Sequence, residues 1–204
     1  MPRHAIVPPM NVIRRRTMTP EQFLAWEERQ ERRYEFDGFA PVLMVGSTEE
    51  HSDIQANILA ALRPRLRGKP CRVHGSDLKI KVGGSIRYPD AFVVCSPRQR
   101  GRKVVDDPVI VFEILSESTE HTDLIEKNEE YRVTPSIQRY VLLQQTHIAG
   151  LVFARGPEGS WVSQVLDGAD AVLDLPEIDT QLLLGELYAD MDIAGRTETP
   201  SVET

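Results

Sequence analysis

Cysteine is scarce in this chain of 204 residues. The two cysteines, Cys71 and Cys95, lie far apart, and neither belongs to a CxxC pair. This spacing offers neither a disulfide framework nor the ligand set of a zinc site. We therefore expect two unpaired thiols and a protein that works in a reducing, cytoplasmic compartment.

Long apolar segments are also missing. No apolar run approaches the roughly 18 residues that a membrane-spanning helix needs. The apolar stretch near the N-terminus is broken by prolines, whereas the core of a signal peptide is continuous. We expect a protein that is neither exported nor embedded in a membrane.

The sequence lacks the basic excess that most DNA-binding proteins carry, because its formal net charge is -7. Residues 186–204 hold five acids and one arginine and so contribute -4 of this charge. Acids gathered around a metal ion would make the remaining surface less repulsive still. The net charge therefore does not exclude a nucleic acid as partner.

The length and the 41% hydrophobic content fit one compact domain with irregular ends. Residues 1–16 hold a run of three arginines and no periodic apolar pattern, which predicts a mobile basic arm. We expect the domain to span residues 17–190 and to be followed by an acidic disordered tail, 191–204.

Helix signals are clear at three places. Thr19 and Gln22 form a capping box around Pro20, which predicts a helix over residues 20–33. Apolar residues at helical spacing predict a second helix over residues 49–66, and a third is expected over residues 122–133. Strands are expected at residues 34–36, 41–45, 71–74, 78–82, 86–95, 109–115, 138–143, 148–154, 161–166 and 171–173. This order predicts an α/β (mixed α+β) fold with a central mixed sheet flanked by helices.

A hairpin turn at Gly83 and Gly84 would set Asp77 directly opposite Asp90. Like charges opposed across a strand pair are destabilising, so such a pair requires a cation or a raised pKa. The alternative is a register error of one residue, which would leave Asp77 as a solvated residue at a strand start.

One carboxylate, Glu113, interrupts the apolar strand expected over residues 109–115. Burying an ionised carboxylate in a central strand is costly unless it is paired or bound to a metal. Glu113 is therefore a candidate functional residue. The structural alternative is a glutamate at a strand end that reaches solvent or pairs with an arginine such as Arg87.

The helix after this strand places Asp123, Lys127 and Tyr131 on one face, at spacings of four residues. Lys127 lies near the start of the helix, from where its long side chain can reach the end of the Glu113 strand. The alternative is an ordinary Asp123–Lys127 ion pair on a solvated face.

These motifs together resemble the Uma-two family of the PD-(D/E)XK nuclease superfamily, over residues 17–188. The resemblance rests on Tyr88-Pro89-Asp90, on residues 111–119, and on Asp123, Lys127 and Tyr131. Supporting motifs are Arg33-Tyr34-Glu35 before an Asp-Gly turn, His51, Ser76-Asp77 and Pro135-Ser136-Ile137. Their combined spacing is specific, whereas any single motif would be weak.

The resemblance implies a restriction-endonuclease-like core with a Mg²⁺ site, in which Mn²⁺ can substitute. Its implied ligands are Asp90, Glu113 and the backbone carbonyl of Ile114, and we add Asp77 as a fourth candidate. Oxygen ligands suit such a hard cation. Lys127 would orient the attacking water or neutralise the developing phosphate charge. We expect it to act as the catalytic base or charge stabiliser, with Glu35 and Asp77 as auxiliary acids.

Some residues depart from the family pattern. Leu115 stands where the superfamily usually has its lysine, so Lys127 is the implied replacement. Glu117 stands where a proline is expected, Gln144 stands where an acid is expected after the next strand, and residues 34–38 are one residue short. These departures weaken any assignment for Glu35 and for the region of Gln144.

The remaining candidates each have an equally good structural interpretation. Glu35 and His51 could add a catalytic acid, a metal ligand or a substrate contact, or could only bond neighbouring groups. A basic loop after the Asp90 strand could contact DNA phosphates or be a solvated charge run. Its basic residues are Arg98, Arg100, Arg102 and Lys103.

The sequence thus predicts a Mg²⁺-dependent endonuclease acting on DNA. Two other functions stay open: a catalytically inactive module of the same fold that binds DNA or a protein partner, and a metal-dependent hydrolase of small phosphoesters. A homodimer is compatible with the sequence.

Overall fold

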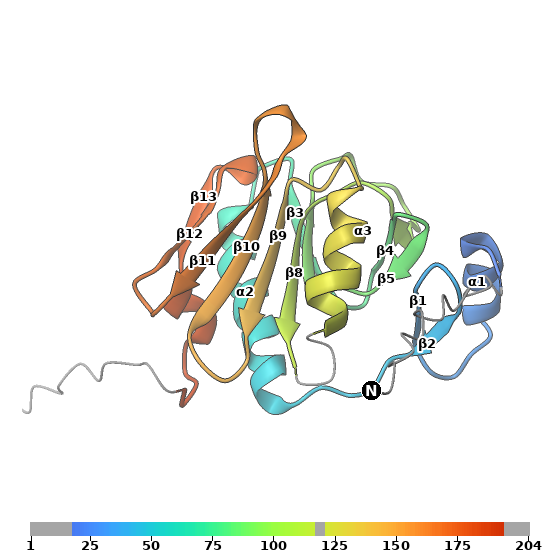
Figure 1. Ribbon diagram of the computed structural model, residues 1–204, viewed down its shortest axis with the longest axis horizontal. Helices are drawn as coiled ribbons and strands as arrows, with labels where there is room; N and C mark the ends of the chain where they lie inside the picture. The colour runs from blue at the N-terminus through green and yellow to red at the C-terminus, as the bar shows by residue number, and fades with distance from the viewer. Residues whose placement is uncertain (1–17, 117–120, 194–204) are drawn as a thin grey trace, which may run out of the picture.

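The structure, a computed structural model, describes residues 18–116 and 121–193. Two larger sheets, a two-stranded sheet and a few helices form a mixed α+β fold (Figure 1). Among the described residues no helix is long and apolar enough to cross a membrane. The arm expected over residues 1–16 and most of the expected tail lie outside the described residues.

The larger sheet has six strands in the order β11-β10-β9-β8-β6-β3. β8 and β9 run parallel and the other neighbours are antiparallel, so the sheet is mixed as expected. The bounds are β3 Arg72–Gly75, β6 Ala91–Val94, β8 Pro108–Leu115, β9 Arg139–Gln144, β10 Ala149–Arg155 and β11 Trp161–Asp167. Residues of β8 are buried along nearly its whole length, which makes it the central strand.

The smaller sheet has the order β2-β1-β5-β4-β7 and lies beside the N-terminal helix (Figure 1). Its bounds are β1 Tyr34–Phe36, β2 Pro41–Leu43, β4 Lys79–Val82, β5 Ser85–Arg87 and β7 Val104–Val105. The helix is α1, Pro20–Glu27, which begins with the expected Thr19–Gln22 capping box but ends six residues earlier than expected.

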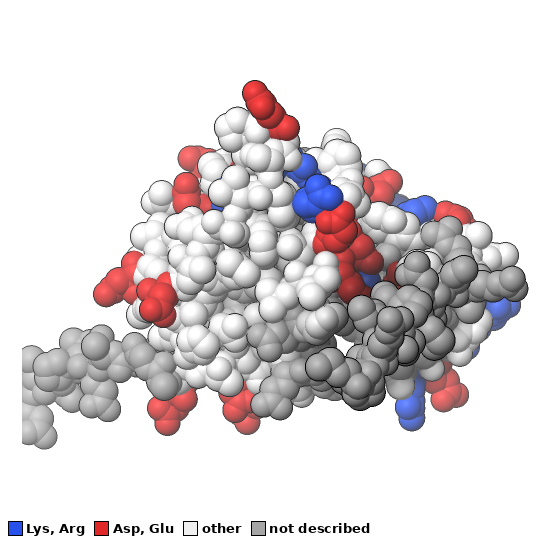
Figure 2. Space-filling model, in the orientation of Figure 1, with Lys and Arg blue, Asp and Glu red and all other residues white. Residues whose placement is uncertain are grey.

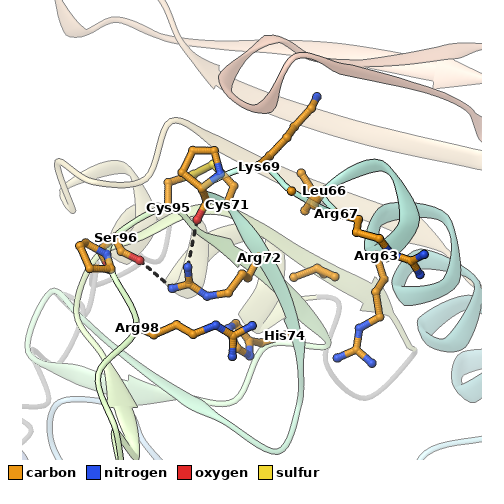
Figure 3. Close-up of a pocket in the computed structure, with 14 residues that line it drawn as sticks. Arg63, Leu66, Arg67, Lys69, Cys71, Arg72, His74, Cys95, Ser96 and Arg98 are labelled. Atoms are coloured by element: carbon orange, nitrogen blue, oxygen red, sulfur yellow. Dashed lines mark hydrogen bonds between the residues drawn. A yellow bond between two sulfur atoms is a disulfide. The ribbon is translucent and has the colours of Figure 1, made fainter.

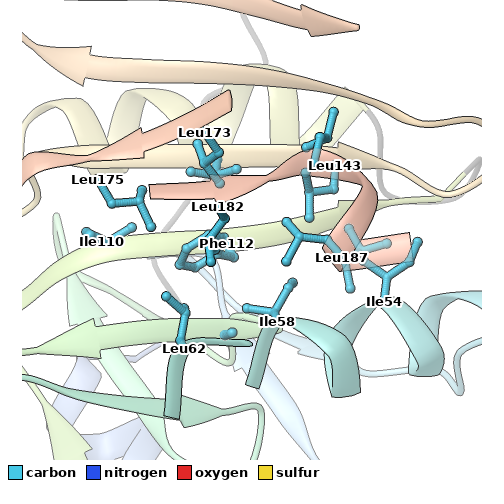
Figure 4. Packing of buried hydrophobic residues seen from close by; sticks show 14 of the residues in the cluster. Ile54, Ile58, Leu62, Ile110, Phe112, Leu143, Leu173, Leu175, Leu182 and Leu187 are labelled. Carbon is cyan, nitrogen blue, oxygen red and sulfur yellow. The ribbon is translucent and has the colours of Figure 1, made fainter. Parts of the chain in front are cut away.

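One face of the larger sheet is covered by α2, Glu49–Arg65, and by the C-terminal part of the chain. Ile54, Ile58 and Leu62 point from α2 into this core and meet Phe112 of β8 (Figure 4). The C-terminal part comprises β12 Val172–Leu175, η3 Pro176–Ile178, β13 Thr180–Leu183 and η4 Leu184–Tyr188, whereas η2, Pro157–Gly159, is an exposed turn between β10 and β11. Met191 and Ile193 are buried in the same core.

The other face of the larger sheet is covered by η1, Thr122–Lys127, and α3, Asn128–Arg132. η1 is a π-helical turn that continues directly into α3, where the sequence predicts one uninterrupted α-helix. Tyr131 of α3 is fully buried against Tyr140 of β9, with ring centroids 4.7 Å apart. This contact fixes the helix above the strands that carry the site.

The strand expected over residues 86–95 is two strands that belong to different sheets. β5 ends at Arg87 and β6 begins at Ala91, and Pro89 between them cannot donate a ladder hydrogen bond. The predicted hairpin register is confirmed, since Val82 pairs with Ser85 and Ile80 with Arg87. The ladder stops there, so Asp77 and Asp90 are not a cross-strand pair.

The two cysteines form a disulfide, Cys71–Cys95, so the expectation of two free thiols is wrong. β3 and β6 are antiparallel, and Arg72 pairs with Val94. Cys71 and Cys95 are the next pair in this register. The sequence could not predict the bond because it does not reveal that these two strands are neighbours.

Candidate active site

Asp90 and Glu113 come together at neighbouring ends of β6 and β8. Ala91 pairs with Phe112, so Asp90 and Glu113 are the next two residues in register. Opposed residues of an antiparallel pair point to the same face. The peptide N–H of Ile114 also donates to Oδ2 of Asp90 at 2.7 Å. The strands therefore hold both carboxylates on the face that η1 and α3 cover.

The Glu113 carboxylate is only 3% exposed. Nζ of Lys127 and the hydroxyl of Tyr131 both donate to its Oε1, each at 2.9 Å. Both structural alternatives for Glu113 are excluded. The residue is too buried to reach solvent, and Arg87 pairs with Glu35 and Glu130 instead. Glu113 and Lys127 are thus paired in the interior, and the partly exposed Asp90 lies beside them.

Lys127 also meets Asp123, with Nζ 2.9 Å from Oδ1. This is the helical pair that the spacing alone suggests, but both residues are buried, so the face is not a solvated one. The Oε1 atom of Glu35 lies 4.0 Å from the same ammonium. Lys127 therefore has three carboxylates around it, and the π-helical turn ends on this residue.

Glu35 reaches the cluster from β1. The peptide N–H of Tyr88 donates to its Oε1 at 2.9 Å, and Arg87 donates to its Oε2 at 3.1 Å. Arg87 is 2% exposed and also binds Glu130 of α3 through two hydrogen bonds. Arg87 therefore ties the smaller sheet to the helix that carries Lys127.

His51 lies on the opposite side of Asp90, at the start of α2. Thr48 caps this helix, and its hydroxyl accepts from the His51 peptide N–H. Nε2 of His51 is 3.1 Å from Oδ2 of Asp90, and Gln55 donates to the Asp90 backbone carbonyl at 2.8 Å. The α2 helix therefore fixes both the backbone and the side chain of Asp90.

The charges of the cluster change its proton affinities. Burial, together with the nearby carboxylates of Asp123, Asp90 and Glu35, raises the pKa of Glu113 well above its usual range, although Lys127 opposes the shift. Burial alone would lower the pKa of Lys127, but the surrounding carboxylates raise it well above its ordinary value. The cluster thus contains more negative charge than its lysine neutralises.

The donors present suit a divalent cation of the Mg²⁺ type. Two carboxylates lie side by side next to the Ile114 peptide, and such an ion commonly uses one or two carboxylates and keeps several waters. The excess of negative charge around Glu113 would be relieved by a cation. The described residues contain no group of three His, Cys, Asp or Glu arranged to hold an ion, so these donors make at most a two-carboxylate site.

Several candidates lie outside the cluster. Asp77 is exposed and binds Arg33, with Oδ1 2.6 Å from the guanidinium. Arg102 is held by Asp106 and Asp107, and Lys103 pairs with Glu28. Among the four basic residues of the loop, Arg98 and Arg100 are the ones for which the described structure gives no acid partner.

The roles of Arg87 and Glu130 were not predicted from the sequence. The one available signal was helical spacing, since Glu130 lies three residues after Lys127 and thus near it on the helix surface. Arg87 was considered only as a partner of Glu113, because its actual acid partners, Glu35 and Glu130, come from segments that are far away in the sequence.

Known proteins resemble this chain along most of its length. It is 30% identical over 174 residues to "Uncharacterized protein slr1290" of Synechocystis sp. (strain ATCC 27184 / PCC 6803 / Kazusa), which covers 84% of this chain and 91% of that protein. It is 22% identical to "Uncharacterized protein sll1609" of the same organism, over 81% of this chain and 96% of that one.

The fold is similar to a crystal structure of "a putative nuclease belonging to DUF820" from Anabaena variabilis ATCC 29413. The TM-score is 0.70 at 19% sequence identity, with 83% of this chain and 97% of the other covered. The model of the family Uma2, described as "Putative restriction endonuclease", matches residues 20–184. The resemblance inferred from the motifs is therefore confirmed, and this chain belongs to the Uma2 family.

Proposed function

We propose that this protein is a metal-dependent endonuclease that hydrolyses phosphodiester bonds of DNA. The observation that carries the proposal is the convergence of the partly exposed Asp90 with the buried pair of Glu113 and Lys127. A carboxylate pair beside a lysine is what phosphodiester hydrolysis needs, because the reaction must activate a water and stabilise a developing negative charge. Membership of a family described as restriction endonucleases supports the same reaction class.

Asp90, Glu113 and the Ile114 carbonyl would hold a Mg²⁺ ion, with Mn²⁺ as a substitute. A bound ion of this kind polarises a phosphodiester and lowers the pKa of a water. Asp90 is kept in position by the Ile114 N–H and by His51. The remaining candidate residues would stabilise the charge of the reacting phosphate or orient the side chains that do so.

Lys127 is the candidate for charge stabilisation. Its raised pKa keeps the ammonium protonated at neutral pH, so it can neutralise a phosphate but cannot serve as a general base in this state. Asp123 and Tyr131 would orient Lys127 and Glu113 from the same helix. Glu35, fixed by Arg87, would place a further negative charge near the ammonium.

One observation favours a second function, an inactive module that binds DNA or a protein partner. Lys127 and Glu113 already satisfy one another inside the fold, as a purely structural ion pair would. A buried pair without a catalytic role can be replaced by apolar residues at little cost to the fold. The two functions therefore differ in whether the acids are needed for anything beyond folding.

The test is a cleavage assay with supercoiled plasmid and single-stranded DNA in Mg²⁺, in Mn²⁺ and in chelator. We expect cleavage with either metal and none with chelator. Asp90→Asn, Glu113→Gln and Lys127→Met should each lower the rate at least 100-fold, because each removes a charge that the reaction requires.

The control is Glu126→Gln, which removes an exposed carboxylate from the same π-helical turn. It should cleave like the wild type. Folded Glu113→Gln protein that cleaves at the wild-type rate would reject the endonuclease site, and wild-type protein that binds DNA without cleaving it under any metal condition would favour the inactive module.

A further inference from the structure

A second polar feature lies at the outer edge of the larger sheet, away from the carboxylate cluster. It is a cavity of about 660 Å³ between the end of α2, the edge strand β3 and the segment after β6 (Figure 3). The Cys71–Cys95 disulfide forms part of its wall. Asp90 and Cys95 flank the two ends of β6, so the cavity and the cluster are about 16 Å apart by the rise of a strand.

The wall of this cavity is basic. Its charged side chains are Arg63, Arg67, Lys69, Arg72 and Arg98, and no aspartate or glutamate lines it. The cavity is therefore basic although the whole chain has a net charge of -7. Burial, together with Arg72, Arg98 and Arg63, lowers the pKa of His74, which also lines the cavity, so the local potential is positive.

Most of these arginines are available to a ligand. Arg63, Arg67 and Arg98 are exposed, and the described structure places no carboxylate within ion-pair distance of them. An alternative explanation for these arginines is that they interact favourably with the dipole at the C-terminal end of α2. The Arg65 guanidinium has this role, since it donates to the backbone carbonyl of Ala61 at 2.8 Å. In the described structure the side chains of Arg63 and Arg67 make no such bond to a helix carbonyl.

Arg72 is preorganised at the centre of the wall. Its guanidinium donates to the backbone carbonyls of Pro70, at 2.9 Å, and Ser96, at 2.6 Å (Figure 3). Both acceptors are neutral, so the positive charge of Arg72 is not cancelled. Arg63 and Arg98 approach from opposite sides, while Lys69 extends away and binds carbonyls of residues 178 and 179.

The basic surface continues beyond this cavity. A second one, of about 350 Å³, shares Arg72, His74 and Arg98 with the first and adds Arg100, together with Arg102, whose charge is paired with Asp106 and Asp107. It also has no aspartate or glutamate in its wall. The two together form a track along the sheet edge, and a track suits a chain of repeated phosphates better than one small anion.

We propose that this track binds backbone phosphates of a DNA strand at a site remote from the carboxylate cluster. The assignment rests on the proposed function only in taking DNA as the ligand. Phosphate contacts of this kind position a nucleic acid and do not depend on its sequence. The face over α3 gives no comparable surface, since acidic atoms gather there beside the basic ones (Figure 2).

The experiment measures binding of a labelled 20-base-pair duplex in chelator, so that cleavage does not interfere, across a series of salt concentrations. Each phosphate contact contributes about 0.9 to the slope of log K against log salt. The double variant Arg63→Gln/Arg98→Gln should reduce that slope by about 2 and weaken binding at least 10-fold at low salt. Both side chains are exposed, and an unchanged melting temperature would confirm that the variant is folded.

The matched control is Arg29→Gln/Arg32→Gln, which removes the same charge from exposed positions outside both cavities. It should keep the wild-type slope. Equal losses in the two double variants would overturn the proposal, because net charge alone would then explain binding. Wild-type protein that binds no duplex, or that binds inorganic phosphate or a mononucleotide more tightly than the duplex, would overturn it as well.

Failure of this proposal can be told apart from failure of the nuclease. A cavity variant that keeps the wild-type salt slope, in a protein that cleaves DNA, rejects the track alone. A cavity variant that loses binding, in a protein that never cleaves DNA with metal, supports the track and rejects the nuclease.

Discussion

Glu113 shows how one residue links the sequence pattern to chemistry. A single carboxylate in an apolar strand predicts a paired or metal-bound acid, and the structure gives it Lys127 and Tyr131 as neighbours. Its raised pKa means that ionising it in the folded, metal-free protein is unfavourable. That cost has a measurable dependence on pH.

We predict that Glu113→Gln is at least as stable as the wild type at neutral pH in chelator. Because the folded pKa is raised, the full stability is present below the ordinary glutamate pKa, about 4.3, and falls as the pH rises toward the folded pKa. Glutamine does not ionise, so the Glu113→Gln variant does not lose this stability. In the wild type, each unit of difference between the folded and unfolded pKa corresponds to about 1.4 kcal/mol of unfolding free energy. Urea unfolding at pH 4.5 and 7.5 measures it, and a variant that is less stable at both pH values would show that the ionised Glu113 stabilises the fold.

Arg87 gives the opposite prediction. It is 2% exposed and binds Glu35 and Glu130, so Arg87→Met leaves two carboxylates without their cation. Removing one member of a buried ion pair costs about 3–5 kcal/mol. Urea unfolding measures the loss.

A surface pair provides the comparison for Arg87. Arg132 and Glu129 are both exposed, so Arg132→Met should cost less than about 1 kcal/mol. Similar small losses in both variants would mean that the Arg87 network contributes little to the fold.

At the level of elements, local signals predicted most of the secondary structure. The Thr19–Gln22 capping box and the apolar spacing in residues 49–66 identified the starts of α1 and α2 correctly. The errors lie in segments whose secondary structure depends on contacts with residues far away in the sequence. Nothing local divides residues 86–95 between two sheets apart from Pro89, and nothing local makes residues 122–127 a π-helical turn.

The disulfide connects elements in a way that can be measured. Cys71 and Cys95 enclose a loop that the 24-residue separation defines, and closing such a loop stabilises a fold by about 3 kcal/mol in the chain-entropy description. Reductant should therefore lower the urea midpoint of the wild type. Cys71→Ser/Cys95→Ser should start at the lower midpoint and not respond, and a wild-type midpoint that ignores reductant would contradict the bond.

For the whole molecule, more of the carboxylate cluster than of the basic track could be predicted from the sequence. Asp90, Glu113 and Lys127 were singled out because their residue types conflict with an ordinary strand or follow the family spacing, and the fold brings them together. In the basic loop, Arg102 pairs with the nearby Asp107 and Lys103 pairs with Glu28, while DNA binding by Arg98 and Arg100 stays a prediction. The cavity arginines Arg63 and Arg67 fit an ordinary helix end in sequence, so only the fold reveals them.

The central claim, that the paired carboxylates hold a divalent cation, is tested most directly by the melting temperature in a Mg²⁺ titration without DNA. A ligand at about 100 times its Kd adds about 2.7 kcal/mol to the stability of the folded state, which for a domain of this size is a rise of roughly 5–10 °C. We predict this rise for the wild type and for Glu126→Gln, and none for Glu113→Gln or Asp90→Asn. A Glu113→Gln protein that keeps the full rise would contradict the account.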